Sequence, residues 1–358
     1  MRLMVVSRRY PPDQFSGTET VIANVVERAR RRHEVRLVAG WQQDPTLLPA
    51  DARKVQLAGA PKPVGWARLA RAAADEARIF RPDVVLSNSI ETPTGLAPTV
   101  TIVYDFNFGS SQRLATARLR GAFYRFQSRR LAKVVVISEA TRRFAIERGF
   151  PADKLEVIYP GVDVDRFRPD PEVPPLPPRG EPAVLAYPSR ILPGKAQHLA
   201  IEAFARLPEP WRERAELRIV GAVADEEYLA ELRRAAAGLN VSFHTDVADI
   251  VPHYRSAHVI LFPTMMEEGF GYTAAEGMAC GKPVVHFRCA AVDEACTGAA
   301  VGVPAGDTSA MAAAVVELLG APERCAELGR AGRRRVEQTF SWDAIWARYR
   351  EVLFSIVR

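Results

Sequence analysis

Short apolar runs alternate along the chain with longer stretches of helical periodicity. In the first half, strand-like runs occupy Leu3–Ser7, Glu34–Ala39, Asp83–Ser87, Val100–Tyr104 and Lys133–Ile137, and Asp153–Ile158 predicts a last short strand. Helices are predicted between these strands, notably over Thr18–Arg32 and Ser111–Leu131. Apolar strands that alternate with helices are typical of a parallel sheet wrapped by helices.

A proline-rich segment, residues 168–182, interrupts this alternation and reads as a stiff linker. After it, strands are predicted at Ala183–Tyr187, Glu216–Val220, Val241–His244, Val259–Phe262 and Pro283–Phe287, and helices from Ala196, over Glu226–Ala237 and over Tyr272–Cys280. A last helix, Ser341–Ile356, has Ser341 as its expected N-cap and carries Trp342, Trp346 and Tyr349 on one face.

The predicted fold class is therefore α/β, with two Rossmann-like domains, residues 1–167 and 183–340, joined by the linker 168–182. Residues 341–358 should form a C-terminal helix that packs back toward the first domain. In open parallel sheets, ligands bind beyond the carboxyl ends of the strands, so the cleft between two such domains is the expected ligand site.

Composition adds limits to this picture. The chain has 358 residues, of which 48% are apolar and 25% charged, as in a globular protein of two domains. No apolar run approaches the ~18 residues of a spanning helix, and the first run is too short for a signal peptide. The four cysteines have neither zinc nor disulfide spacing. We therefore expect a reduced cytoplasmic protein, with a peripheral location at the inner membrane face as the alternative.

Charge is distributed unevenly between the two halves. Residues 1–167 hold 27 Lys and Arg against 17 Asp and Glu, hence +10, which leaves −4 of the total of +6 for the remainder. A basic first half indicates an anionic partner, such as a phosphate, a phospholipid or an acidic acceptor. Nucleic acid is not expected, because the arginine-rich stretches contain no recognisable nucleic-acid motif.

The most informative segment runs from Glu267 to Val285. Gly269 and Gly271 flank Phe270 where a loop enters a helix, and a glycine loop at a helix N-terminus suits a phosphate. Glu268 precedes that helix and Glu276 lies just over one turn inside it. We expect the two carboxylates to grip two ends of one extended ligand and not to share a proton.

This segment resembles the retaining glycosyltransferases of family 4, which have the GT-B fold. Their pattern of a glutamate, Gly-Phe-Gly, a second glutamate eight positions after the first and Gly-x-Pro-Val-Val stands here as Glu268, Gly269-Phe270-Gly271, Glu276 and 281–285. The resemblance implies that Glu268 contacts the donor sugar and Glu276 the ribose. The backbone of Gly269–Gly271 would face the sugar and the diphosphate.

The resemblance covers nearly the whole chain. Arg190 and Lys195 match a family motif and would clamp the diphosphate, where preplaced cations stabilise the charge that grows on the leaving phosphate. Ala196 replaces the usual glycine after the lysine, which we take as a conservative change. Gly17 stands where the family has a Gly-Gly loop near the donor phosphate. Its other interpretation is a simple helix-start glycine.

The chain departs from the family at Tyr104 and Asp105, where many members have a His-Asp pair beside the reacting centre. Tyr104 is a poor base, because its reference pKa is ~10, while Asp105 could orient the acceptor. His33 is expected to be structural. The resemblance implies front-face transfer in which the donor's phosphate takes the acceptor proton, with no metal and no cofactor besides the nucleotide sugar, such as a UDP- or GDP-sugar. Asp163-Val-Asp165 is formally an Asp-x-Asp motif, but we interpret it as structural.

On the acceptor side, the chain has no acidic residue between Phe106 and Ser138 but seven basic ones. On a helical projection Arg118, Arg125 and Arg129 share one stripe, and Leu119, Phe123 and Phe126 share another. Either the apolar stripe lies in the core and the arginines in water, or the helix presents a surface to an anionic membrane or a phosphorylated acceptor.

Four functions fit these patterns to different degrees. The first is a retaining, metal-independent hexosyltransferase with an unidentified acceptor: a saccharide, a lipid-linked saccharide or a small natural product. The second is a non-catalytic partner subunit of the same fold, suggested by Tyr104. The third is another sugar-nucleotide enzyme, such as an epimerase. The fourth, a Rossmann dehydrogenase, needs Gly-x-Gly-x-x-Gly after the first strand, which residues 6–12 do not supply.

Overall fold

The computed structural model describes residues 1–12, 17–88, 90, 95, 97–104, 114–174, 176–177 and 181–357, and for residues 114–120 the backbone only. Within them the chain divides into two compact units. The first unit contains Met1–Gly161 and Trp342–Arg358, and the second contains Val162–Ser341. The segment around 168–182, interpreted above as a linker, is therefore grouped with the second unit, and the C-terminal helix with the first.

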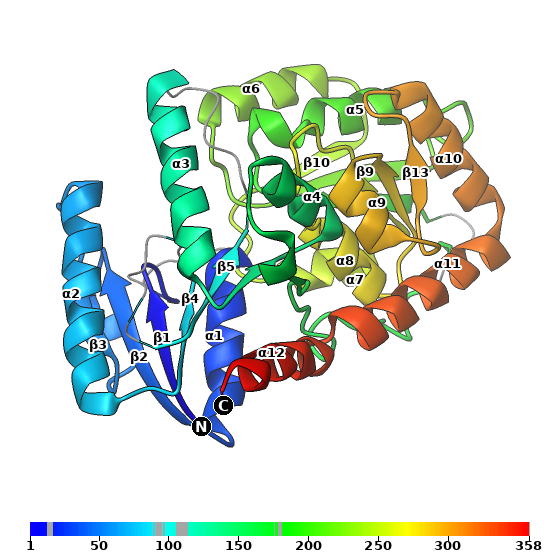
Figure 1. Ribbon diagram of the computed structural model, residues 1–358. Helices are drawn as coiled ribbons and strands as arrows, with labels where there is room; N and C mark the ends of the chain where they lie inside the picture. The colour runs from blue at the N-terminus through cyan, green and yellow to red at the C-terminus, as the bar shows by residue number, and fades with distance from the viewer. Residues whose placement is uncertain are drawn as a thin grey trace. The chain divides into compact units, whose positions relative to one another are not determined.

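The first unit is built on a seven-stranded parallel sheet in the order β3-β2-β1-β4-β5-β6-β7 (Figure 1). Its strands are β1 Arg2–Ser7, β2 Glu34–Trp41, β3 Arg53–Gln56, β4 Val84–Ser87, β5 Thr99–Val103, β6 Lys133–Val136 and β7 Leu155–Val157. Its helices are α1 Gly17–Arg30, α2 Lys62–Phe80, α3 Leu114–Arg130, α4 Glu139–Glu147 and α12 Trp342–Ile356. The short strand β3 was not predicted.

The second unit has a six-stranded parallel sheet in the order β10-β9-β8-β11-β12-β13. Its strands are β8 Ala183–Pro188, β9 Ala215–Val220, β10 Val241–His244, β11 Val259–Phe262, β12 Val284–Phe287 and β13 Val301–Val303. Its helices are α5 Gln197–Ala205, α6 Glu226–Ala235, α7 Val251–Ser256, α8 Tyr272–Ala279, α9 Ala290–Cys296, α10 Thr308–Gly320 and α11 Pro322–Arg335, followed by a π-helix, Val336–Phe340. The prediction of two Rossmann-like parallel sheets is confirmed.

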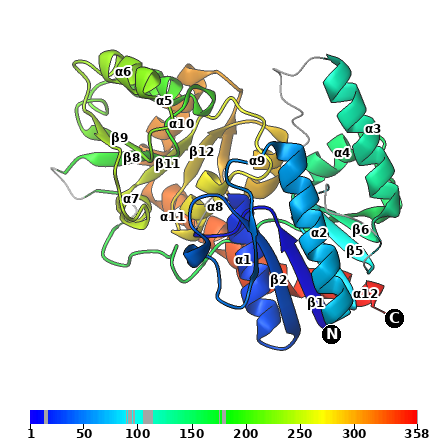
Figure 2. The same cartoon turned by 90° about the vertical axis from the view of Figure 1, so that its left-hand side faces the viewer.

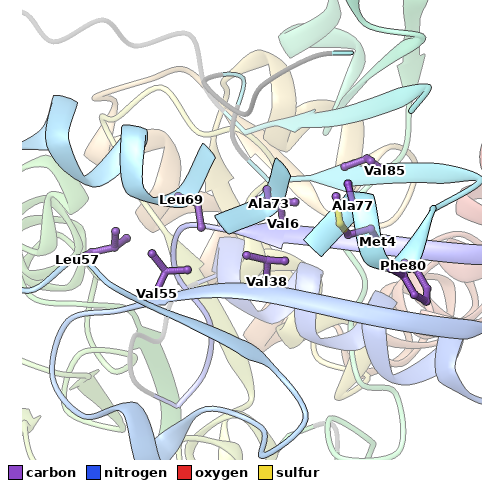
Figure 3. Packing of buried hydrophobic residues seen from close by; sticks show 10 residues of the cluster. All are labelled: Met4, Val6, Val38, Val55, Leu57, Leu69, Ala73, Ala77, Phe80 and Val85. Atoms are coloured by element: carbon purple, nitrogen blue, oxygen red, sulfur yellow. The ribbon is translucent and has the colours of Figure 1, made fainter. Parts of the chain in front are cut away.

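The core of the first unit shows why these sequences form these layers. Every second residue of a strand points to the same face, and Met4, Val6, Val38 and Val85 point to the face covered by α2 (Figure 3). Helix α2 packs against this face with residues at the three- and four-residue spacing of one helix face: Leu69, Ala73, Ala77 and Phe80. Figure 1 shows α1 on the other side of the same sheet.

Helix α12 packs within the first unit, against α1. Trp342, Ile345 and Tyr349 are buried, and the guanidinium group of Arg28 on α1 lies 5.7 Å from the centre of the Trp342 ring. The ring of His33, which follows α1, lies 5.5 Å from that of Phe354. His33 therefore has the structural role expected of it.

The orientation of helix α3 differs from one of the two alternatives predicted from the sequence, in which its apolar stripe lies in the core. Its phenylalanines were expected either in the core or at the surface, and Phe123 and Phe126 are 43% and 56% exposed. Tyr124, Gln127 and Ser128 are buried instead. The side chains of Leu119 and Arg118 lie outside the described residues. In Figure 2 the helix runs beside β6 and α4.

All four cysteines are free, and three of them, Cys280, Cys296 and Cys325, are buried. Burial raises the pKa of the Cys280 and Cys296 thiols to about 12. Among the helices that the structure describes, none combines the length and the hydropathy needed to cross a membrane.

Candidate functional site

Apart from Gly17, the sequence-predicted donor residues lie in the second unit, in α8 and in loops that follow the carboxyl ends of β8 and β11. These loops are Ser189–Lys195 and Pro263–Gly271. The second loop leads directly into α8. Gly271 stands at the N-cap position with a left-handed φ of 97°, and in its place a Cβ would lie 3.0 Å from Val292. This position therefore requires glycine.

The amino end of α8 is held against the end of β8. Thr273 Oγ1 donates a hydrogen bond of 2.9 Å to the carbonyl of Pro188. Among the described residues, no side chain caps this helix. The uncapped first turn carries the positive end of the helix dipole, which favours an anion.

Lys195 and Glu268 form an ion pair between the two loops. Lys195 Nζ lies 2.5 Å from Glu268 Oε1, and only 14% and 15% of the two side chains are exposed. Thr264 Oγ1 donates to the same oxygen at 2.9 Å. The backbone of Lys195 is fixed too, because the buried hydroxyl of Tyr187 donates to its carbonyl at 2.6 Å. A charged pair that is both shielded from water and rigid is a preorganised electrostatic element.

The second carboxylate has a different partner. The hydroxyl of Tyr254, on α7, donates to Glu276 Oε2 at 2.7 Å, and the tyrosine is fully buried. Burial raises the pKa of Glu276 to about 7, although the hydrogen bond from Tyr254 and the charge of Arg166 act in the opposite direction. Glu276 thus titrates near neutral pH.

Tyr254 was not predicted from the sequence as a site residue. It lies 22 residues before its partner, and no motif marks it. Its ring is held edge-on by Phe167, with the ring centres 5.6 Å apart. The only signal that could have found it is its place in α7, the helix that precedes β11.

Gly221 is a second residue that was not predicted from the sequence. It follows β9 with a φ of 146°, and a Cβ there would lie 2.2 Å from the carbonyl oxygen of Ser189. Because only glycine permits this approach, Gly221 sets the path of the loop that carries Arg190. The side chain of Arg190 is exposed, while its carbonyl accepts a hydrogen bond of 2.8 Å from Gln197 Nε2.

Phe270 and Ala196 have structural roles that the motif alone does not show. Phe270 is 3% exposed, and its ring packs edge-on against Phe340 with the centres 5.0 Å apart, so that only its backbone can face a ligand. Ala196 has a left-handed φ of 54°. The replacement of glycine there is therefore not conservative, because an L-residue in this conformation costs ~1 kcal/mol.

In the first unit, Gly17 is the first residue of α1. The hydroxyl of Tyr104, just beyond β5, donates a hydrogen bond of 3.1 Å to the carbonyl of Thr18, beside Gly17. Tyr104 thus ties the end of β5 to the first turn of α1. Asp105 lies outside the described residues.

In the Asp-x-Asp sequence, the first aspartate makes local hydrogen bonds to the backbone that follows it. Asp163 Oδ1 accepts hydrogen bonds from the backbone nitrogens of Asp165 and Arg166, at 3.2 and 3.0 Å. The first carboxylate therefore closes a turn. Across the described part of the chain, no group of three or more His, Cys, Asp or Glu side chains is placed to hold a metal.

Comparison with protein families gives two matches that together span most of the chain. The model for Glycosyltransferase Family 4 matches residues 15–166, and the model for Glycosyl transferases group 1 matches residues 182–321. The two matches lie almost entirely in different structural units.

Curated relatives include a GDP-mannose-dependent alpha-(1-6)-phosphatidylinositol monomannoside mannosyltransferase of Mycolicibacterium smegmatis, 33% identical over 239 residues. This alignment covers 62% of the chain and 61% of the relative. A D-inositol 3-phosphate glycosyltransferase of Saccharomonospora viridis is 33% identical over 226 residues, which cover 56% of the chain and 51% of the relative. The chain thus aligns with only half to three fifths of the length of these relatives.

Solved structures match over nearly the full length. Anabaena HepE in complex with UDP superposes with a TM-score of 0.81 at 20% identity, covering 99% of the chain and all of that protein. Sucrose-phosphate synthase from Thermosynechococcus elongatus gives a TM-score of 0.80 at 17% identity, covering 99% of both. These likenesses confirm the expected fold, which the chain shares with glycosyltransferase structures.

Proposed function

Because the chain belongs to glycosyltransferase family 4, we propose that it is an enzyme that transfers a hexose-type sugar from a nucleoside-diphosphate sugar to an acceptor. The observation that carries this proposal is the shielded pair of Lys195 and Glu268 at the entry to α8. It supplies a cation for a phosphate and a carboxylate for a sugar in one fixed unit.

The carboxylates are arranged to bind hydroxyl groups. Both hydrogen bonds to Glu268 go to Oε1, and the bond to Glu276 goes to Oε2. Among the described residues, none donates a hydrogen bond to the other carboxylate oxygen of either side chain, so that oxygen is left to accept a hydrogen bond from a ligand. We assign Glu268 to the sugar and Glu276 to the ribose.

The diphosphate would lie between these two ends. The uncapped N-terminus of α8, with the backbone of Gly269–Gly271, supplies N–H donors, and Lys195 and Arg190 supply positive charge. As the bond between the sugar and the phosphate breaks, negative charge grows on the leaving oxygen. Fixed cations stabilise that charge without reorganising, and the loss of one such donor costs ~100- to 1000-fold in turnover.

We further propose that transfer retains the anomeric configuration and needs no metal, with a leaving phosphate oxygen that takes the acceptor proton. Tyr104 supports this assignment, because its hydroxyl is committed to the carbonyl of Thr18. A tyrosine in that contact is a scaffold for the loop at Gly17 and not a general base. No second carboxylate of the glycosidase kind is then required.

The acceptor is assigned to the first unit on the basis of its charge. Residues 1–167 carry +10, so an acceptor that bears a phosphate group fits best. The names of the relatives agree, since one acts on a phosphatidylinositol mannoside and another on D-inositol 3-phosphate. The relatives suggest two donor bases for the test below: guanine, as in the GDP-mannose of the mannosyltransferase, and uracil, as in the UDP-glucose of the HepE complex.

The test is a thermal-shift screen with UDP, GDP, ADP and dTDP, followed by turnover of the matching nucleotide sugar. One nucleotide should raise the melting temperature, by an amount that corresponds to ~2.7 kcal/mol at 100 times its dissociation constant. Glu276→Ala should abolish that shift. No response to any of the four nucleotides would refute the proposed donor site.

A second measurement separates the two carboxylates and the two candidate functions. Glu268→Ala should reduce turnover more than nucleotide binding, and equal losses in both would contradict its contact with the sugar. A non-catalytic partner subunit, which Tyr104 suggests, would bind nucleotide but neither hydrolyse nor transfer the sugar with any phosphorylated acceptor.

A further inference from the structure

Helix α3 presents an exposed face that mixes aromatic rings with arginines. We define the basic aromatic face by its exposed residues: Phe123, Arg125, Phe126, Arg129 and Arg130. The opposite side of the helix faces the core, where Tyr124 packs in one cluster with Leu131, Val134, Ala145 and Phe150. The helix is thus anchored through Tyr124, and its phenylalanines point away from the core.

The two phenylalanines are unusual for a solvated helix. They lie three positions apart, hence on one side, and are 43% and 56% exposed. Ser128 and Gln127 take buried positions instead, and the hydroxyl of Ser128 is satisfied by the carbonyl of Arg125 at 2.9 Å. An exposed pair of large rings beside buried polar residues indicates a partner surface.

The charges on this face have a single sign. No acidic residue occurs between Phe106 and Ser138. Among the described residues, no carboxylate lies within ion-pair distance of Arg125, Arg129 or Arg130. The guanidinium of Arg130 lies 5.4 Å over the ring of Phe126, so ring and charge form one unit. The complement of this face is both negatively charged and apolar.

We propose that the basic aromatic face binds the surface of an anionic phospholipid bilayer. At such a surface, the phenylalanine rings can enter the boundary between headgroups and acyl chains while arginines pair with lipid phosphates. A helix that lies in the interface places both kinds of side chain at their preferred depths. The phosphates of a nucleic acid could pair with the arginines, but they would leave the two phenylalanine rings on the exposed face of the helix without an apolar environment.

The geometry also fixes the position of one arginine. A Cβ at Gly149, just after α4, would lie 2.7 Å from Arg125 Cδ, so the arginine stem runs over this glycine. The stem is packed on protein while the side chain as a whole stays exposed. Arg125 is therefore oriented before any lipid is bound.

The test is flotation of the protein with vesicles of phosphatidylcholine alone and of phosphatidylcholine with phosphatidylglycerol. The wild type should bind the anionic vesicles and be released by salt. Phe123→Ser with Phe126→Ser should weaken binding at least about tenfold. Arg125→Gln, Arg129→Gln and Arg130→Gln should each weaken it about fivefold, on anionic vesicles only.

A matched control is available on α2. Ile79 is 79% exposed, but the neighbouring Arg78 is paired with Asp75 at 2.8 Å. Ile79→Ser with Arg78→Gln should leave vesicle binding unchanged. Each variant should keep the melting temperature and the nucleotide-induced shift of the wild type, which separates this proposal from that of the donor site.

Three outcomes would overturn the proposal. One is wild-type protein that does not float with anionic vesicles. Another is equal binding by wild type and the phenylalanine double variant. The third is that the face binds another partner. In that case the same variants would lose a dimer seen by sedimentation, or lose binding to a single-stranded oligonucleotide, while their binding to vesicles would not change.

Discussion

Nucleotide binding should depend on pH through Glu276. Burial raises the pKa of this carboxyl to about 7, and the groups that face it are the hydroxyl of Tyr254 and the charge of Arg166. Below that pH the group is neutral, and above it the group is a carboxylate. If ribose hydroxyls donate to the carboxylate, a proton competes with the ligand. Nucleotide binding is then strongest well above pH 7 and weakens as the pH falls through about 7.

The size of the effect follows from the pKa. With a pKa of about 7, Glu276 is roughly nine-tenths charged at pH ~8 and nine-tenths protonated at pH ~6. The apparent dissociation constant should therefore rise about tenfold between these two values, which corresponds to ~1.4 kcal/mol. Removal of the hydrogen bond in Tyr254→Phe should raise the pKa further and move the midpoint upward.

Calorimetric titration of the preferred nucleoside diphosphate between pH ~5.5 and ~8.5 measures this dependence. The terminal phosphate of the ligand itself ionises near pH ~6. To remove this contribution, the dissociation constant of the wild type at each pH is divided by the dissociation constant of Glu276→Gln at the same pH. The glutamine keeps the shape of the side chain but does not titrate. A ratio that stays constant across the whole range would refute the assignment of Glu276 to the ribose.

The remaining predictions concern stability, measured by urea unfolding. Gly221→Ala should cost ~2 kcal/mol or more, because the added Cβ meets the carbonyl of Ser189, whereas the control Gly238→Ala, with open space around it and a φ of 78°, should cost only ~1 kcal/mol. Ala196→Gly should stabilise by up to ~1 kcal/mol, since it removes the strain of a left-handed alanine; a destabilised variant would contradict this. Phe270→Ala should cost ~3–5 kcal/mol through the cavity it leaves, and a loss below ~1 kcal/mol would show that the ring is not packed as described.

The proposed donor half of the site can be recognised in the sequence because its residues are local along the chain. Glu268, the glycines and Glu276 belong to one loop and the helix that it enters, so their order along the chain is also their order in space. Lys195 lies 73 residues away from Glu268. Only the family resemblance connected the two, because spacing carries no information over such a distance.

Other features could not be predicted for physical reasons. The edge strand β3 has the sequence Arg-Lys-Val-Gln, whose single apolar residue gives no periodic signal. The orientation of α3 was ambiguous since a helical projection weighs apolar residues alone. A serine that satisfies its hydroxyl within its own helix can be buried at little cost, as Ser128 is. A helical projection takes no account of such a hydrogen bond, so it could not predict that Ser128 is buried in place of the phenylalanines.

The two carboxylates of the donor motif differ in what stabilises their charge, and this difference has consequences for function. Glu268 faces a lysine ammonium at 2.5 Å, so its charge is balanced by a cation. Glu276 accepts a hydrogen bond from a neutral hydroxyl, and burial outweighs both this bond and the charge of Arg166, so that the pKa of its carboxyl is about 7. A change of pH near neutrality should therefore act on the ribose end of the donor. Removal of Lys195 should act on the end where the bond to the sugar breaks, so that affinity and turnover can be varied separately in this one motif.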